Sequence, residues 1–279
     1  MKLALIADIH ANLPALQAVL ADVDAWRPDL VVVLGDIVNR GPHPRECHEL
    51  VFSRARAADW RLLAGNHEEY VLSKHREPAA PGTPAFAIHQ HTYWTAAQLF
   101  GLVAALAKLP DRVDVDFAEP AGRASCVHAS LLGNRDGIYP EMGDADLAGR
   151  VDGRARLFAV GHTHRPLIRE LDGTLVANVG SVGLPFDGDQ RAGYARAVAA
   201  GSGWKVSIRR LVYDWKQTRD DCGAREFVAG SGAVAHIIRR ELEIAHPLLA
   251  KWTYRFEEPI LSGRVSVEQS VTEFLDDWR

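Results

Sequence analysis

Short apolar runs recur along the first three quarters of the chain, and each ends at a glycine or a polar residue. Continuous apolar runs bounded by turn signals are typical of buried β-strands. The strands predicted in this way are 2–7, 29–34, 60–64, 123–127, 156–160 and 174–177. Two later runs, 192–199 and 204–213, predict an antiparallel hairpin around Gly201-Ser202-Gly203.

Helical periodicity separates the early strands. One predicted helix face collects Leu13, Leu16, Leu20 and Val23. Residues 43–57 and 86–108 are also predicted to be helical, and the Pro-rich segment 76–85 is predicted to be a loop. Alternating strands and helices indicate a mainly parallel sheet with crossover helices, so periodicity alone predicts an α/β fold with a mixed sheet.

The strand pattern stops at about residue 214. Beyond it, residues 233–245 and 266–278 are predicted to be helical. A chain of 279 residues suits one large α/β domain with a small appendage. We therefore divide it into a domain at 1–213 and a helical C-terminal extension at 214–279 that packs on the same domain.

Composition narrows the class of protein. The formal net charge is -4 and the sequence pI is about 6.3, so the basic footprint of a duplex nucleic-acid binder is lacking. Cys47, Cys126 and Cys222 lie far apart and are interpreted as ordinary reduced thiols. The first apolar run is too short for a signal peptide, and no run reaches the roughly 18 apolar residues of a membrane span. These features favour a soluble cytoplasmic protein without a membrane partner, and they leave the oligomeric state open.

Polar residues of metal-ligand type follow the predicted strands. Ligands of open α/β sheets bind beyond the carboxyl ends of the strands, so these side chains are expected to converge at one rim. They are Asp8, His10, Asp36, Asn66, His67, His128, His162 and His164. Each alone has an ordinary interpretation, such as a helix cap, a turn or a core histidine. Their joint occurrence predicts a metal site.

The ligand types also indicate which metal would bind. Carboxylate, amide and imidazole groups without a thiolate suit manganese, iron, cobalt or zinc. Even without His67, the seven remaining residues exceed what one catalytic ion with an open coordination position can use. Two ions roughly 3.5–4 Å apart that share a carboxylate fit the count.

The order of these motifs resembles the calcineurin-like metallophosphoesterase superfamily, above all its compact bacterial branch of YfcE-like and diadenosine-tetraphosphatase-like proteins. The motifs are D-x-H at 8–10, G-D-x-x-x-R-G at 35–41, G-N-H-E at 65–68, the single His128, and G-H-x-H at 161–164. The likeness extends through 178–193. It implies a four-layer α/β/β/α sandwich of two mixed sheets.

The resemblance also implies a role for each position. Asp8, His10 and His164 would hold a first ion, Asn66, His128 and His162 would hold a second, and Asp36 would bridge both. His67 would bind no metal but would protonate the leaving oxygen, and Arg40 would contact the phosphate oxygens. Asn12 is a further candidate substrate contact, with the cap of the following helix as the alternative.

The implied activity is hydrolysis of phosphomonoesters, phosphodiesters or dinucleoside polyphosphates by a hydroxide that bridges two divalent ions. Manganese is the first choice, with iron, zinc, cobalt, nickel or magnesium as alternatives, and a small nucleotide-like molecule is the expected substrate. Asn39 stands where protein phosphatases have an aspartate, which argues against that activity. The rival hypotheses are a DNA exonuclease of the same fold and a non-catalytic metal-binding scaffold protein.

Other polar residues near the motifs are given structural roles. His89 and His91, on the predicted helix 86–108, are interpreted as surface residues, with the alternative that this segment covers the site and contacts the substrate. Glu68 and Glu69 are interpreted as acidic residues that favour the N-terminus of a helix.

Overall fold

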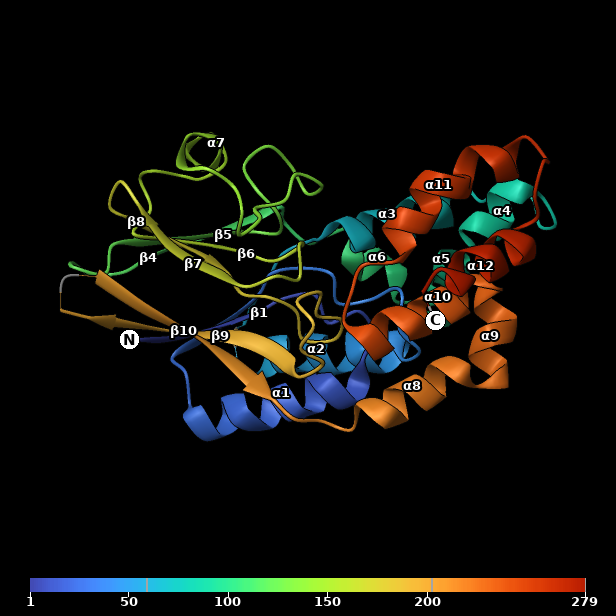
Figure 1. Ribbon diagram of the computed structural model, residues 1–279. Coiled ribbons are helices and arrows are strands. Elements are labelled where there is room, and N and C mark those ends of the chain that lie inside the picture. Colours follow the sequence, from blue (N-terminus) through green and yellow to red (C-terminus); the bar gives the residue numbers. More distant parts are fainter. Residues whose placement is uncertain (59, 202, 279) are drawn as a thin grey trace.

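Two mixed five-stranded sheets stack against each other in the computed structural model, which describes residues 1–58, 60–201 and 203–278 (Figure 1). The first sheet has the order β10-β9-β1-β2-β3. Its strands are β1 (Lys2–Ile6), β2 (Leu30–Val33), β3 (Arg61–Leu62), β9 (Ala192–Ala200) and β10 (Gly203–Leu211). β1, β2 and β3 run parallel, and β9 and β10 form the predicted antiparallel hairpin. Ser202 in its turn lies outside the described residues.

The second sheet has the order β4-β5-β6-β8-β7. Its strands are β4 (Arg112–Asp116), β5 (Arg123–Val127), β6 (Leu157–Val160), β7 (Leu167–Leu171) and β8 (Thr174–Asn178). β5, β6 and β8 run parallel, and the antiparallel strands β4 and β7 form its two edges. The sequence pattern missed these edge strands, because their residues alternate between half-buried and exposed positions and form no continuous apolar run.

The apolar residues of the sheets divide among three interfaces, which confirms the predicted four layers. The inner faces meet in a core that includes Leu3, Leu5, Val32, Cys126, Leu157 and Ala177. The other face of the first sheet packs on α1 (Leu13–Trp26) and α2 (Pro44–Ala58), and Leu16, Leu20 and Val23 of the predicted helix face are buried there. The outer face of the second sheet packs on Ile138 and on Leu147 of the short helix α7 (Asp144–Ala148).

The single helix predicted over 86–108 is wrong. After α3 (Asn66–Arg76), the chain forms three shorter helices, α4 (Pro84–Ile88), α5 (Gln90–Gln98) and α6 (Val103–Leu106). His89 leaves helical geometry between the first two. Gly101 takes a φ of 80° between the last two, a left-handed conformation that no helix contains. The helical spacing of apolar residues therefore continues through positions where the backbone leaves the helix, and it does not reveal these breaks.

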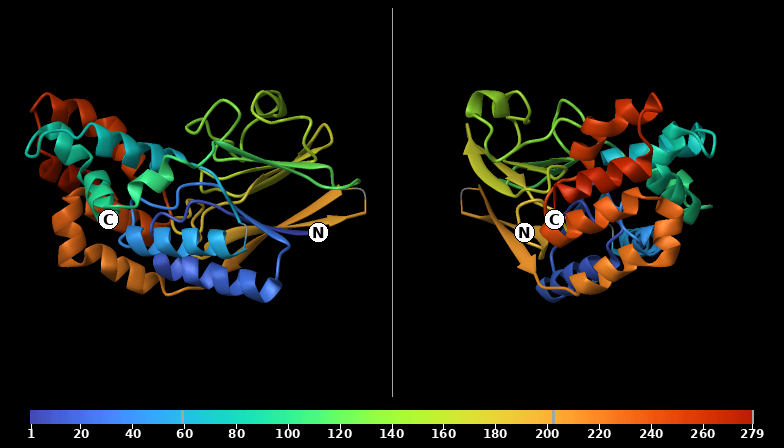
Figure 2. Two further views of the ribbon diagram at one scale, coloured as in Figure 1. Left: turned by 180° about the vertical axis from the view of Figure 1, so that it is seen from behind. Right: turned by 45° about the vertical axis from the view of Figure 1, so that its right-hand side comes forward.

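The C-terminal extension consists of α8 (Trp215–Gly223), α9 (Arg225–Ser231), α10 (Val234–Ile244), α11 (Leu249–Leu261) and α12 (Val267–Asp276). Only α10 and α12 correspond to predicted helices, and Arg279 lies outside the described residues. The helices share an apolar core built around Trp252, Phe256 and Phe274, which Ile88 of α4 joins. Figures 1 and 2 show α8–α12 at the same end of the sheets as α3–α6.

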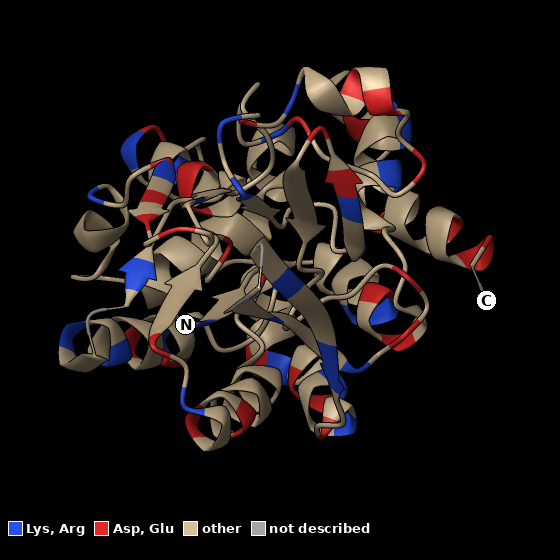
Figure 3. Cartoon of the chain, turned by 90° about the vertical axis from the view of Figure 1, so that its left-hand side faces the viewer, with Lys and Arg blue, Asp and Glu red and all other residues tan. Residues whose placement is uncertain are grey.

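Lys and Arg positions lie among Asp and Glu positions along the chain in the cartoon of Figure 3. Many of them form ion pairs, such as Arg196 with Asp22 at 2.7 Å and Arg112 with Asp152 at 2.5 Å. Among the described residues, no helix is both long and apolar enough to cross a bilayer.

Candidate metal centre

The predicted ligand residues follow strands of both sheets. Asp8 and His10 follow β1, Asp36 follows β2, Asn66 and His67 begin α3 after β3, His128 follows β5, and His162 and His164 follow β6. Because β1 pairs parallel with β2, and β5 with β6, the carboxyl ends of each pair meet at one edge of their sheet. All seven predicted ligands come together where the two edges face each other.

The loops that carry these residues are locally strained. Positive φ angles, which residues other than glycine rarely adopt, occur at Asp8, His10, Ala11, Asp36, Asn39, Arg40, His162 and His164. Such a conformation costs about 1–3 kcal/mol per residue and persists only where the surrounding structure holds it. Backbone strain of this kind clusters at functional sites, so its concentration here marks the rim of the sheets as the candidate site.

Two glycines leave room for the carboxylates. A side chain at Gly65 would overlap Asp36, and one at Gly161 would overlap Asp8. Both glycines belong to the motifs that supply other ligands. Their role is therefore steric, because they let two loops approach an acidic side chain closely.

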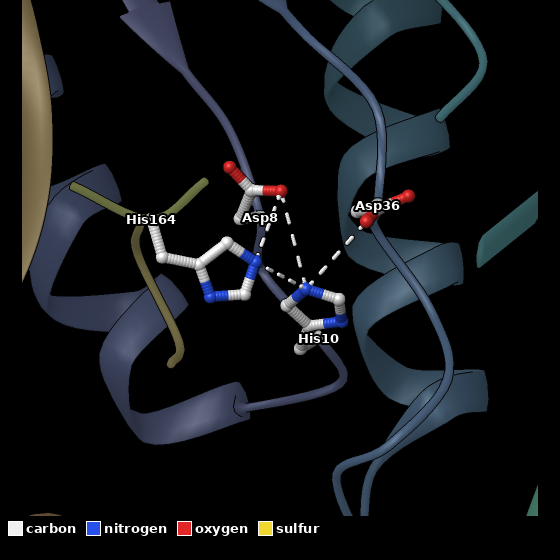
Figure 4. Close-up of side chains that lie close together, drawn as sticks. All are labelled: Asp8, His10, Asp36 and His164. Carbon is white, nitrogen blue, oxygen red and sulfur yellow. Dashed lines mark hydrogen bonds and ion pairs between the residues drawn. The ribbon is translucent and has the colours of Figure 1, made fainter. Parts of the chain in front are cut away.

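A first group of side chains contains two carboxylates and two imidazoles. Each of Asp8, His10, Asp36 and His164 is buried and offers one ligand atom, and these atoms all lie within 4.8 Å of one another (Figure 4). His164 Nε2 lies 3.4 Å from Asp8 Oδ1 and 3.1 Å from His10 Nε2. His10 Nε2 lies 3.6 Å from Asp36 Oδ2. Oxygen and imidazole donors at this spacing suit a divalent cation.

A second group adjoins the first through Asp36. Asn66 Oδ1 lies 2.9 Å from both His128 Nε2 and His162 Nδ1. His128 Nε2 also lies 3.4 Å from Asp36 Oδ2. One oxygen of Asp36 is therefore within 3.6 Å of an imidazole from each group.

Both carboxylates keep one oxygen without a hydrogen bond. The backbone N–H of His67 donates to Asp36 Oδ1 at 2.8 Å, and that of His162 donates to Asp8 Oδ2 at 2.9 Å. Asp36 Oδ2 and Asp8 Oδ1 are buried and have no hydrogen-bond partner. A buried anionic oxygen without a partner is costly, and a bound cation would remove that cost. The residues present thus fit a divalent metal.

Backbone carbonyls orient two of the imidazoles. His128 Nδ1 donates to Leu34 O at 2.7 Å, and His164 Nδ1 donates to Leu184 O. In a neutral ring with its proton on Nδ1, the lone pair lies on Nε2. His128 Nε2 faces Asp36, and His164 Nε2 faces Asp8. Metal binding through Nε2 requires this tautomer, with the proton on Nδ1.

The charge states of these groups depend on burial and on one another. Burial, with His67 and His164 nearby, lowers the pKa of His10 well below its usual value, and burial next to His128 lowers the pKa of His162 to about 4. Burial opposes ionisation of Asp36, but the surrounding histidines, His128 first, hold its pKa well below the usual range. Burial likewise opposes protonation of His128, yet Asp36 raises its pKa to about 10, so a cation would have to displace the Nε2 proton of His128 in order to bind there.

His67 lies beside the first group without pairing to a carboxylate. Its ring centre is 4.8 Å from that of His10, edge to face. Asn39 Nδ2 donates to His67 Nδ1 at 2.9 Å, and Asn39 Oδ1 accepts from Thr95 Oγ1 at 3.3 Å. Because Nδ1 accepts, the proton of the neutral His67 ring lies on Nε2. Burial lowers the pKa of His67 well below its usual value.

The structure contradicts a substrate-contact role for Asn12. Its Oδ1 caps α1 by accepting from Ala15 N and also accepts from Thr218 Oγ1, while its Nδ2 donates to Gly183 O and to Tyr213 OH. The side chain is buried, and every hydrogen-bonding site is used. The alternative interpretation, a helix cap, is confirmed.

Glu68 is an organising residue that sequence reasoning underestimated. Its carboxylate accepts from the backbone N–H of Gly65 at the N-terminus of α3, and it also accepts from the backbone N–H groups of Asp36, Ile37 and Val38. Burial raises the pKa of Glu68 to about 7. This one side chain therefore links the loop after β2 to the loop after β3. In the sequence, this role is indicated only by the position of Glu68 directly after the G-N-H motif.

His91 is buried, so its interpretation as a surface residue is wrong. It lies on α5, its Nδ1 has no hydrogen-bond partner, and burial beside Arg40 lowers its pKa to about 3. Thr92 and Thr95 of the same helix contact Asn39, so α5 reaches the residues around His67. This agrees with the alternative that the segment covers the site.

Comparison with known proteins places the chain in a family. Residues 1–166 match the calcineurin-like phosphoesterase family. A metallophosphoesterase from Sphaerobacter thermophilus is 30% identical with a TM-score of 0.68, over 88% of this chain and all of that structure. The uncharacterised protein MJ0912 of Methanocaldococcus jannaschii is 29% identical, over 77% of this chain and 89% of its own length. The hypothetical protein PH1004 of Pyrococcus horikoshii shares the fold, with 20% identity and a TM-score of 0.69 over 83% of this chain and 98% of that structure. The chain belongs to the calcineurin-like phosphoesterase family.

Proposed function

We propose that this protein is a phosphoesterase that uses two divalent cations to hydrolyse small phosphate esters or anhydrides. The single observation that carries this proposal is the position of Asp36 Oδ2. It is buried without a hydrogen bond, 3.6 Å from His10 Nε2 and 3.4 Å from His128 Nε2. An oxygen so placed can serve a cation on either side, which is the requirement for a shared ligand.

The two groups of donors divide the proposed ligands. Asp8, His10 and His164 would hold one ion, and Asn66, His128 and His162 the other, with Asp36 common to both. Bound divalent ions supply an activated water and neutralise the negative charge that builds up on the phosphoryl group. Manganese is our first choice of metal because the donors are oxygens and imidazoles without a thiolate.

His67 is the proposed general acid. Asn39 Nδ2 lies 2.9 Å from His67 Nδ1, which leaves Nε2 as the ring nitrogen that would face the leaving oxygen. To donate a proton the ring must be an imidazolium, and the neutral Asn39 side chain orients the ring but cannot stabilise that charge. A positioned acid accelerates such a reaction by about 10²–10⁴-fold.

An aromatic surface next to His67 supports a nucleotide-like substrate. The Tyr70 ring centre is 5.5 Å from that of His67, and 36% of Tyr70 is exposed. The Arg135 guanidinium lies 4.9 Å from the Tyr70 ring and pairs with Glu69 at 2.7 Å. A planar, partly exposed ring at this place suits a leaving group that carries a nucleobase.

Metal removal and return test the proposal. Protein stripped with EDTA is divided into a metal-free portion and a portion reloaded with manganese. Both are assayed on p-nitrophenyl phosphate, bis-p-nitrophenyl phosphate, a dinucleoside polyphosphate and single-stranded DNA. We expect two ions per chain by elemental analysis, and hydrolysis of the small esters by the reloaded portion only.

Two results would decide for the rivals. Hydrolysis of single-stranded DNA as fast as the small esters would favour an exonuclease. The mildly acidic composition argues against that activity, because nucleic-acid binders usually carry basic patches. A fully loaded protein that cleaves none of the compounds favours a non-catalytic scaffold. One ion per chain, with Asp36 bound to it alone, contradicts the shared-ligand geometry.

A further inference from the structure

The C-terminal extension reaches the proposed site through an ion pair. Arg40, in the loop after β2, donates from Nη1 to Glu241 Oε2 on α10 at 3.0 Å. The Glu241 side chain is 0% exposed and that of Arg40 11%. The partners are 201 residues apart in the sequence. A buried ion pair that joins such distant segments holds them in one geometry, because separating the charges leaves one of them uncompensated.

The Glu241 carboxylate is itself held rigidly. Its Oε1 accepts from the backbone N–H groups of Leu248 and Leu249 at 2.7 and 2.8 Å, where α11 begins. A left-handed residue, Ala245, makes the turn between α10 and α11. A carboxylate at a helix N-terminus is favoured by the helix dipole as well as by these hydrogen bonds. Glu241 therefore presents Oε2 to Arg40 from a fixed position.

The Arg40 guanidinium keeps unused donors near the candidate metal centre. Its Nε is buried without a hydrogen-bond partner. Arg40 lines the same small cavity as His10, so it lies close to the first ligand group. The guanidinium carbon is 5.9 Å from the centre of the Phe186 ring. One nitrogen faces Glu241, and the fork shape of the group leaves others for the oxygens of a phosphate.

The same extension contacts a second loop of the site. Thr218 on α8 donates to Asn12 Oδ1 at 2.9 Å, and Asp221 lies 3.3 Å from His43 Nε2. Asn12 follows the D-x-H motif, and His43 follows the loop that carries Arg40. The helices thus brace the backbone on either side of the guanidinium, while Glu241 sets its direction.

We propose that Glu241 is a positioning residue for Arg40, and that the C-terminal helices complete the phosphate-binding site through it. This inference rests on the proposed function, in which Arg40 binds the substrate phosphate. Glu241 touches neither substrate nor metal in this proposal. It acts by fixing the orientation in which Arg40 offers its remaining N–H groups to a phosphoryl oxygen.

The substitution Glu241→Gln separates positioning from folding. The glutamine oxygen can still accept from Leu248 N and Leu249 N, which keeps the corner between α10 and α11, while its NH₂ group replaces the acceptor of Arg40. We expect the manganese content of E241Q to match the wild type and its melting temperature to fall, because Arg40 loses its buried partner, while the protein stays folded at the assay temperature. We expect its affinity for inorganic phosphate, measured by calorimetry on manganese-loaded protein, and its kcat/KM on bis-p-nitrophenyl phosphate to fall about 10-fold.

Two further variants make the result specific. Glu243→Gln is the matched control, because Glu243 lies on the same helix and pairs at the surface with Arg239 and Arg240 at 3.3 and 3.2 Å. It should leave phosphate affinity and kcat/KM unchanged. In an Arg40→Ala background, Glu241→Gln should cause no further loss, because its effect passes through Arg40.

Unchanged phosphate affinity in E241Q, an equal loss in the Arg40→Ala background, or a wild-type protein that binds no phosphate would overturn the proposal. A wild type that hydrolyses no ester but binds phosphate 10-fold more tightly than E241Q would refute the proposed function and leave the positioning role standing.

Discussion

The loops of the metal centre and the helices of the C-terminal extension are built in opposite ways. The loops bury polar side chains, keep carboxylate oxygens without hydrogen bonds and hold residues such as Asp8, Asp36 and His162 at positive φ. The helices bury an apolar cluster that includes Trp252, Phe256 and Phe274. The loops therefore carry strain and unused binding capacity, whereas the helices carry hydrophobic stabilisation.

The packed regions of the molecule offset the free-energy cost of the strained loops at the site. Strained, polar loops persist only when the surrounding structure over-determines them. Here the parallel strands, the Glu68 carboxylate and the packed helices do so. Substitutions in the loops should thus change metal binding or turnover with little effect on stability, and substitutions inside the helices should do the reverse. Glu241 is the point at which the two regions meet.

The most severe loss is expected for Asp36→Asn. The carboxamide keeps the size of the side chain but removes the charge on the shared oxygen. Loss of a mere supporting partner of a ligand typically costs 10–100-fold in metal affinity, so loss of this ligand should cost more than about 100-fold, with turnover at background. Calorimetric manganese titration measures it, with circular dichroism as the control for folding. Full occupancy at wild-type affinity would contradict the shared-ligand role.

His67→Ala should be nearly as damaging to turnover but harmless to metal binding. The substitution removes the proposed acid and no ligand, so we expect kcat to fall by about 10²–10⁴-fold with two ions still bound. Steady-state kinetics and elemental analysis on the same preparation test both parts. Loss of an ion in this variant would mean that His67 serves the metal rather than the leaving group.

The sequence predicted the chemistry better than the elements around it. The ligand residues stand directly after buried strands, so strand ends and side-chain types were enough to predict their convergence. Sequence pattern missed β4 and β7, whose half-exposed residues form no apolar run, and it fused three helices across His89 and Gly101.

Residues that act over long sequence distances were also beyond reach. Glu68 accepts from backbone groups about thirty positions away, and Glu241 pairs with a residue 201 positions away. Neither contact leaves a periodic signal, since it depends on how whole elements pack. Asn12 is the opposite case. Its place next to a motif suggested a role in the site, but its side chain caps a helix and has all its hydrogen bonds within the protein.

Trp252→Ala tests the helical side of the comparison. Trp252 is 1% exposed, and its Nε1 donates to Ser270 Oγ at 3.0 Å. Deleting the ring should destabilise the protein by about 3–5 kcal/mol, because it leaves a cavity and removes the hydrogen bond that Ser270 Oγ accepts. Denaturant unfolding measures the change, and Tyr254→Ala on the same helix, at a position 95% exposed, should cost less than about 0.5 kcal/mol.

Manganese affinity sharpens this test. At a temperature where Trp252→Ala is still folded, it should bind the ions as tightly as the wild type, because the ligands come from loops of the two sheets. A loss of manganese affinity as large as the loss of stability would show that the helical region and the metal centre are one cooperative unit. The loops and the helices would then not have separate roles.

The smallest effect is expected at a polar pair outside both regions, Asp152 with Arg112. The Asp152 carboxylate accepts from Arg112 Nη2 at 2.5 Å and from Arg154 N at 3.0 Å. The Arg112 hydrogen bond outweighs burial and lowers the pKa of Asp152 to about 2. The folded pKa is thus below the unfolded value of about 3.9, so the ionised group stabilises the protein above that value and loses this contribution as the pH falls from about 4 towards 2.

Asp152→Asn should therefore cost about 1 kcal/mol at pH 6, and the gap from the wild type should narrow as the pH falls to 4 and then 3. Urea unfolding at these three pH values measures it, with manganese uptake at pH 6 as the control. Unchanged uptake is expected, because neither Asp152 nor Arg112 contacts a proposed ligand. A difference in unfolding free energy that stays constant over this pH range would mean that Asp152 acts through packing rather than charge. Weaker manganese uptake would mean that Asp152 also supports the metal centre.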